Sequence, residues 1–130
     1  MNAKDLRSPL AKAKGLGVSQ DATQFSWVQK VTALALVPLV LWFCFSLALL
    51  PEMTYDVLVT WLKSPFNAVM ALVLVLVSLQ HGQMGMQVIF EDYISSHGTR
   101  IAAILITKFI SYFMMALGVY SIISIALGSH

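Results

Sequence analysis

Three long apolar segments constrain this chain more than any other feature. Residues 31–50, VTALALVPLVLWFCFSLALL, carry no charge, over a length close to the roughly 20 residues that a helix needs to cross a bilayer core. We predict three spans, at about 27–50, 65–90 and 101–127. Because a backbone surrounded by hydrocarbon must satisfy its own hydrogen bonds, each span is predicted to be helical and the chain to be an all-α integral membrane protein.

The composition agrees with a membrane protein that has little mass outside the bilayer. Hydrophobic residues make up 58% of the 130 residues and charged residues only 11%, against about 25% charged residues in a soluble domain. The net charge of +2 is too small to indicate nucleic-acid binding. Cys44 is the single cysteine, so the chain can form neither an internal disulfide nor a Cys-x-x-Cys-His attachment for haem.

The basic residues predict how the chain is oriented. Residues 1–26 form a polar, basic tail, and residues 27–130 form the predicted three-span domain. Five lysines and arginines lie in residues 1–30 and Arg100 follows the second span, whereas the opposite side offers only Lys63. The positive-inside rule therefore places the amino terminus inside and the carboxyl terminus outside. The tail has no clear presequence, which favours a bacterial cytoplasmic (inner) membrane over a mitochondrial inner membrane.

His81 is the histidine that lies within an apolar run. An imidazole in hydrocarbon is costly without a partner, so it marks a candidate functional site. On a helix, Ser78 and Gly85 share its face and Gly82 lies on the adjoining flank. Such a strip of small residues could receive a large planar ligand or a second helix. The plainer alternative is a histidine that only hydrogen-bonds to a neighbouring helix.

The spacing of four residues adds a family resemblance. His81, Gly85, Asp92 and Tyr93, in the form H-x3-G-x6-D-Y, resemble the signature of the small hydrophobic membrane anchor, a cytochrome b subunit, of succinate dehydrogenase (respiratory complex II). Arg100, seven residues after the tyrosine, also matches. The resemblance implies that His81 is an axial ligand of haem b iron. It also implies that Tyr93 hydrogen-bonds a ubiquinone carbonyl and that Asp92 lies beside that site.

The same resemblance implies cofactors and partners. A low-spin haem b takes two axial ligands, and His81 would supply one, so a second membrane-anchor subunit would share the haem. An iron–sulfur subunit and a flavoprotein subunit would hold the clusters and the flavin, oxidise succinate and pass electrons to ubiquinone. The chain would thus be part of an enzyme in the tricarboxylic acid cycle and electron transport, with no succinate-oxidising site of its own. Lys30 would meet a haem propionate, although an interfacial anchor is the simpler role.

Several alternatives stay open from the residues alone. The chain could be the anchor of a quinol–fumarate reductase, which runs the same architecture in reverse, or a cofactor-free three-span scaffold. Asp92 could be a surface carboxylate at a helix end. Arg100 could meet phospholipid headgroups, and Lys108 in the third span could extend its ammonium group back to the membrane surface.

Overall fold

Four helices make up the part of the chain that the structure describes. The computed structural model describes residues 20–128. The helices are α2 (Gln20–Ala48), α3 (Tyr55–Lys63), α4 (Pro65–Tyr93) and α5 (His97–Leu127). Residues 20–128 contain no strand, and α2, α4 and α5 are long and apolar enough to cross a membrane. The predictions of an all-α fold and of three spans are therefore confirmed.

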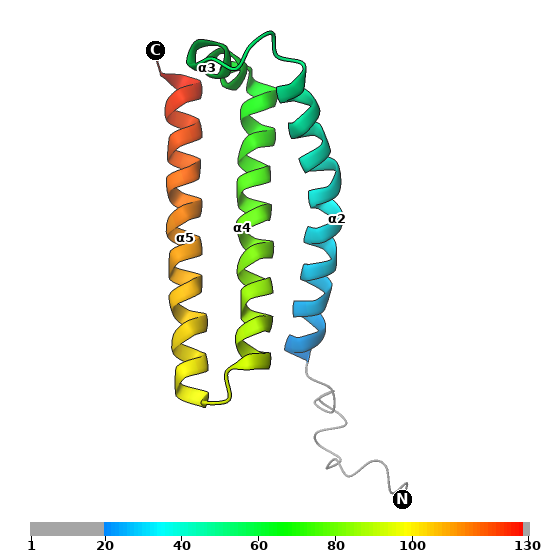
Figure 1. Cartoon of the computed structure of the whole chain (residues 1–130), viewed down its shortest axis with the longest axis vertical. Helices are drawn as coiled ribbons and strands as arrows, with labels where there is room; N and C mark the ends of the chain where they lie inside the picture. The colour runs from blue at the N-terminus through cyan, green and yellow to red at the C-terminus, as the bar shows by residue number, and fades with distance from the viewer. Residues whose placement is uncertain (1–19, 129–130) are drawn as a thin grey trace, which may run out of the picture.

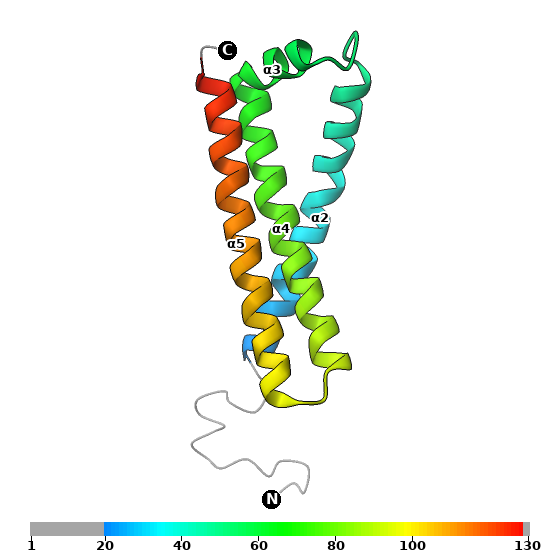
Figure 2. The same cartoon turned by 60° about the vertical axis from the view of Figure 1, so that its left-hand side comes forward.

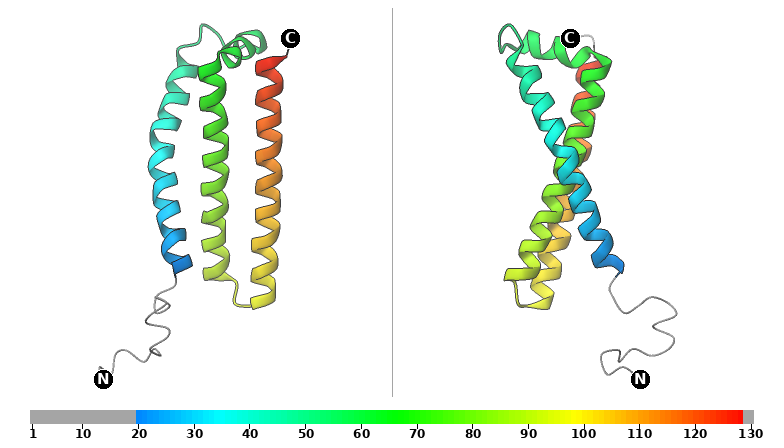
Figure 3. Two further views of the ribbon diagram at one scale, coloured as in Figure 1. Left: turned by 180° about the vertical axis from the view of Figure 1, so that it is seen from behind. Right: turned by 90° about the vertical axis from the view of Figure 1, so that its right-hand side faces the viewer.

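The three long helices stand side by side, with α4 in the middle (Figure 1). Helix α4 packs against both α2 and α5, whereas α2 and α5 do not pack against each other within the described residues. Helix α2 crosses α4 obliquely, while α5 runs beside α4 along its length (Figure 3). The short helix α3 lies across one end of the bundle and contacts α4 and α5 (Figure 2). This arrangement makes α4 the helix on which the others are assembled.

The observed helix ends differ from the predicted spans in a few places. Helix α2 begins at Gln20, so part of the predicted tail is helical, and residues 1–19 lie outside the described residues. Helix α4 continues to Tyr93 and α5 begins at His97, which leaves only residues 94–96 between them. Hydropathy marks where a helix is buried in lipid, and a helix can extend past that region into the interface.

Helix α3 lies between the first two predicted spans, in residues for which no helix was predicted. Its first turn is capped by Thr54, whose side-chain oxygen accepts a hydrogen bond from the Val57 amide at 3.4 Å. Val59 is buried, and the ring of Trp61 stacks on Trp42 of α2 with centroids 5.6 Å apart. Phe66 of α4 meets Trp42 edge-on. This aromatic cluster joins α2, α3 and α4 at the end of the bundle opposite residues 94–96.

Very few side chains are buried within the chain itself. The buried apolar residues among those described are Leu39, Val59, Ala68, Ala71 and Met84. Two of the five are alanines, and α5 approaches α4 through Gly118, where an added Cβ would lie 2.8 Å from Val75 Cγ1. Small residues let membrane helices pack closely, because close van der Waals contact replaces the hydrophobic drive that lipid removes.

We predict that Gly118→Ala weakens the contact between α4 and α5. A valine is stiff about its first side-chain torsion, so Val75 cannot move aside freely, and overpacking of this kind costs about 1–3 kcal/mol. The free energy of unfolding is measured by titrating the detergent-solubilised chain with SDS and following helix content by circular dichroism. Gly98→Ala is the matched control, because an added Cβ at Gly98 meets nothing within 4 Å. Equal changes in the two variants would contradict the packing argument.

Candidate functional site

His81 lies on α4, half-buried against α2. Its Nδ1 is 3.0 Å from Oγ1 of Thr32, a residue 49 positions earlier in the chain. The hydrogen bond to a neighbouring helix, which the sequence offered as the plainer alternative, is therefore present. This is the only hydrogen bond of the His81 ring among the described residues, so it uses one nitrogen and leaves Nε2 available. A neutral imidazole with one nitrogen bound in this way can still act as a ligand through the other.

The face beside His81 is open. An added Cβ at Gly82 or at Gly85 would meet no atom within 4 Å. Ser78 is exposed and its hydroxyl donates back to the Val75 carbonyl at 3.1 Å, so it stays close to the helix surface. We call Ser78, Gly82 and Gly85 the small-residue strip. Neither α2 nor α5 covers the two glycines of this strip, and its flatness fits a planar macrocycle beside the imidazole.

Asp92 and Tyr93 form the end of the same helix. Both are exposed, and Tyr93 retains 83% of its accessible surface. Because α4 is continuous from Pro65 to Tyr93, helix geometry places Asp92 about 16 Å from His81 along the axis and within about 20° of the same face. Tyr93 follows at about 18 Å. The last turn of α4 lies at the same end of the bundle as the start of α2 and of α5 (Figure 1).

A row of polar side chains that the sequence analysis missed runs along α4. Gln83 retains only 4% of its accessible surface, and its Nε2 donates to Gln87 Oε1 at 3.4 Å. Gln87 Nε2 in turn donates to Glu91 Oε1 at 3.0 Å. The row runs from the turn of α4 that carries His81 to the last turn of the same helix. Amides four residues apart in an apolar span were the available signal, since such pairs face one another on a helix.

The remaining predicted site residues do not gather around His81. Lys30 is exposed on α2, two residues before Thr32, which turns it by about 200° to nearly the opposite face of that helix. Arg100 donates to Nδ1 of His97 at 3.1 Å. No hydrogen bond within the described residues joins Lys30 to His81 or Arg100 to Asp92. Lys108 is half-buried on α5.

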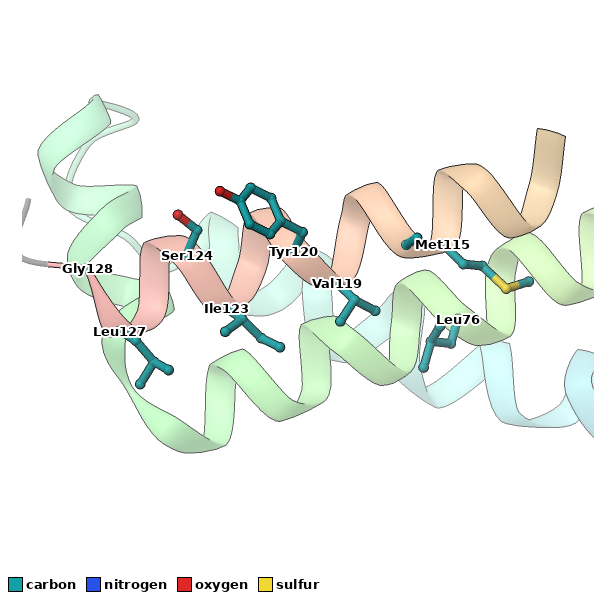
Figure 4. A pocket seen from close by; sticks show the side chains of 9 residues that line it. Leu76, Met115, Val119, Tyr120, Ile123, Ser124, Leu127 and Gly128 are labelled. Atoms are coloured by element: carbon teal, nitrogen blue, oxygen red, sulfur yellow. The ribbon is translucent and has the colours of Figure 1, made fainter. Parts of the chain in front are cut away.

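A groove of about 800 Å³ runs along α5 near the end that α3 covers, with Leu76 of α4 in its lining. Its lining residues are Leu76, Met115, Ala116, Val119, Tyr120, Ile123, Ser124, Leu127 and Gly128. The hydroxyl groups of Tyr120 and Ser124 point away from α4, and Val119 and Ile123 lie toward it (Figure 4). The groove has an apolar character suited to lipid chains, and neither His81 nor Tyr93 lines it.

Among the described residues, His81 has no companion side chains that would complete a metal site. Residues 20–128 contain no cluster of three or more histidine, cysteine, aspartate or glutamate side chains able to hold a metal ion.

Comparison with known proteins gives consistent matches over most of the chain. Residues 4–123 match the family model of the succinate dehydrogenase/fumarate reductase transmembrane subunit. The succinate dehydrogenase hydrophobic membrane anchor subunit of Rickettsia bellii is 33% identical over 107 residues, which cover 82% of this chain and 86% of that protein. The subunit of the same description in Paracoccus denitrificans is 30% identical over 122 residues, or 94% of each chain. No solved structure matches the chain.

Proposed function

The chain belongs to the family of succinate dehydrogenase/fumarate reductase transmembrane subunits, and we propose that it is the membrane anchor of a succinate dehydrogenase, with one half of a haem b site and part of a ubiquinone site. The anchor role is supported by the three membrane-spanning helices and by the relatives, which are succinate dehydrogenase membrane anchor subunits. The observation that carries the haem site is His81, bound through Nδ1 to Thr32 and flanked by an open strip.

The residues around His81 fit a haem. Nε2 would present a lone pair to the iron, and Gly82 and Gly85 would let the macrocycle approach the helix without a steric clash. The haem would supply a one-electron redox centre inside the membrane. Because this chain contributes one histidine within its spans, a second anchor subunit would supply the other axial ligand and would cover the small-residue strip. Lys30 is a weaker candidate for a propionate, since it leaves α2 on the side away from Thr32.

The end of α4 fits a quinone site at the membrane surface. Tyr93 would donate its phenol proton to a carbonyl oxygen of ubiquinone, and negative charge builds on that oxygen as the ring is reduced. A donor held on a helix stabilises this charge without having to reorganise. Asp92, one residue earlier and near the face of His81, would orient the polar groups around the ring or relay a proton toward the quinone.

The remaining partners would assemble on the end of the bundle that carries Tyr93. With the amino terminus inside, this end faces the cytoplasm of a bacterium, where the iron–sulfur subunit and the flavoprotein subunit would bind. Relatives from Rickettsia and Paracoccus support a bacterial inner membrane. The family model also covers fumarate reductase subunits, so a quinol–fumarate reductase anchor is the second candidate. Its direction of turnover would be set by redox centres in other chains.

We predict that His81→Ala removes the b-type α-band from the dithionite-reduced minus oxidised spectrum of the purified complex, or converts the haem to a high-spin form. Loss of an axial ligand leaves the iron with one protein ligand, which changes its spin state. His97→Ala is the matched control, because His97 is exposed and lies outside the apolar runs. An unchanged b-type spectrum in His81→Ala would exclude His81 as the ligand, and a wild-type complex without haem would favour a cofactor-free anchor.

Tyr93→Phe is predicted to lower quinone reduction about 10- to 100-fold while succinate oxidation by phenazine methosulfate stays unchanged. The variant keeps the ring and loses only the donor, and a hydrogen bond to a charged group is worth about 1.5–3 kcal/mol. Steady-state rates with both acceptors separate the quinone site from the flavin. Tyr120→Phe, at the far end of α5, is the control. If both acceptors lose activity in parallel, Tyr93 acts on assembly and not on quinone.

The orientation predicts that a membrane-impermeant maleimide distinguishes the two ends of the bundle in intact spheroplasts. In a Cys44→Ser background, Met53→Cys should be labelled from outside, and Ser95→Cys should be labelled only after permeabilisation, because charged reagents cannot cross the bilayer. Both positions are exposed in the structure. Solubilised, denatured membranes give the total label for each variant. Labelling of Ser95→Cys in intact spheroplasts would reverse the proposed topology.

A further inference from the structure

The surroundings of Thr32 indicate which atom donates the proton in its hydrogen bond with His81. Thr32 Oγ1 lies 3.0 Å from His81 Nδ1, 2.8 Å from the Val28 carbonyl oxygen and 3.0 Å from the Gln29 carbonyl oxygen. A hydroxyl group has a single proton to donate. Three acceptor-capable atoms therefore compete for one proton, and its position decides which nitrogen of His81 carries a hydrogen.

Helix geometry places that proton on the backbone. A threonine inside a helix donates to the carbonyl three or four residues earlier, and here both such carbonyl oxygens of α2 lie within hydrogen-bond distance. The lone pair of Thr32 Oγ1 then faces His81 Nδ1. Two lone pairs in opposition repel one another, so Nδ1 must carry a proton and donate it to Oγ1. In a neutral imidazole this leaves the lone pair on Nε2.

From this geometry we infer that Thr32 is a positioning residue that holds His81 in the tautomer with Nε2 as the metal-binding nitrogen. The inference rests on the proposed haem site. The contact also fixes the ring plane, because one nitrogen is held by α2 while the ring stands on α4. A ligating imidazole that donates its other N–H to an acceptor is a stronger base toward the metal.

The haem midpoint potential separates a positioning role of Thr32 from a simple packing role. A hydroxyl acceptor at Thr32 increases the electron density of the imidazole, which favours ferric over ferrous iron and lowers the haem midpoint potential. A packing role would depend on the volume of the side chain instead. Valine has nearly the shape of threonine without the hydroxyl, and serine keeps the hydroxyl without the methyl group. A positioning role therefore predicts that valine changes the midpoint potential and serine does not, whereas a packing role predicts the reverse.

The test compares Thr32→Val, Thr32→Ser and the wild type as purified complexes, by redox titration of the haem and by the EPR spectrum of its ferric form. For Thr32→Val we expect a higher midpoint potential. The ratio of the affinities of His81 for ferric and for ferrous haem iron should fall by up to about tenfold, which corresponds to about 59 mV for one electron. Haem should also be lost about tenfold more readily on prolonged washing. Thr32→Ser should match the wild type in all three measurements.

Thr60→Val is the matched control, because Thr60 Oγ1 also donates back to a carbonyl, that of Asp56 at 2.8 Å, but on α3 and away from His81. Copurification of the flavoprotein subunit shows that each variant assembles. A Thr32→Val complex with the potential and EPR spectrum of the wild type overturns the inference, as does a Thr32→Ser complex that shifts as far as Thr32→Val. Failure of the haem proposal looks different: His81→Ala then keeps the wild-type spectrum, or the wild type has no haem.

Discussion

The structure depends on one constraint: a polar group in hydrocarbon must find its hydrogen-bond partner within the protein. The backbone meets this demand by forming helices, and several polar side chains of α2 and α4 meet it by bonding to the backbone, to one another or across the helix contact. Thr32 bonds to its own helix and to His81, and Gln83 bonds to Gln87. Among the described residues no buried side-chain nitrogen or oxygen lacks a partner. Thr32, His81 and the Gln83–Gln87 pair are therefore held in defined positions.

The position of α4 between α2 and α5 gives its sides different neighbours, and the candidate site lies on the side that has none. One side of α4 contacts α2 through His81, and another contacts α5 through Val75 and Gly118. A third side, with Gly82 and Gly85, meets neither neighbour. Three helices in one layer cannot enclose a large ligand between them. The open side of α4 is therefore where a second anchor subunit and a haem would complete the assembly.

Relations between residues of one helix could be predicted from the sequence, whereas relations between residues of different helices could not. The shared face of His81, Gly85 and Asp92 followed from spacing, since these residues align whenever the segment is helical, whereas the roles proposed for them came from the family resemblance. The polar row from Gln83 to Glu91 was also within reach of that argument but was overlooked. Lys30 could not be placed by the same means, because its relation to His81 depends on how α2 turns against α4. Helix α3 was missed because a search for long apolar spans does not detect a short amphipathic helix, here one that lies across the end of the bundle.

The sequence by itself determined the three spans and their helical form. Each apolar segment is long enough to cross a bilayer, and a single segment in hydrocarbon satisfies its backbone hydrogen bonds only as a helix. It also marked His81, because a histidine within an apolar run is costly without a partner, and the family resemblance of its motif added Tyr93. Only the tertiary structure decided that α4 is central, that its small-residue strip stays open and that Thr32 is the partner of His81. A threonine in a membrane helix gives no signal of its own, since it can bond to its own backbone. Its contact 49 residues away depends on the crossing of α2 and α4.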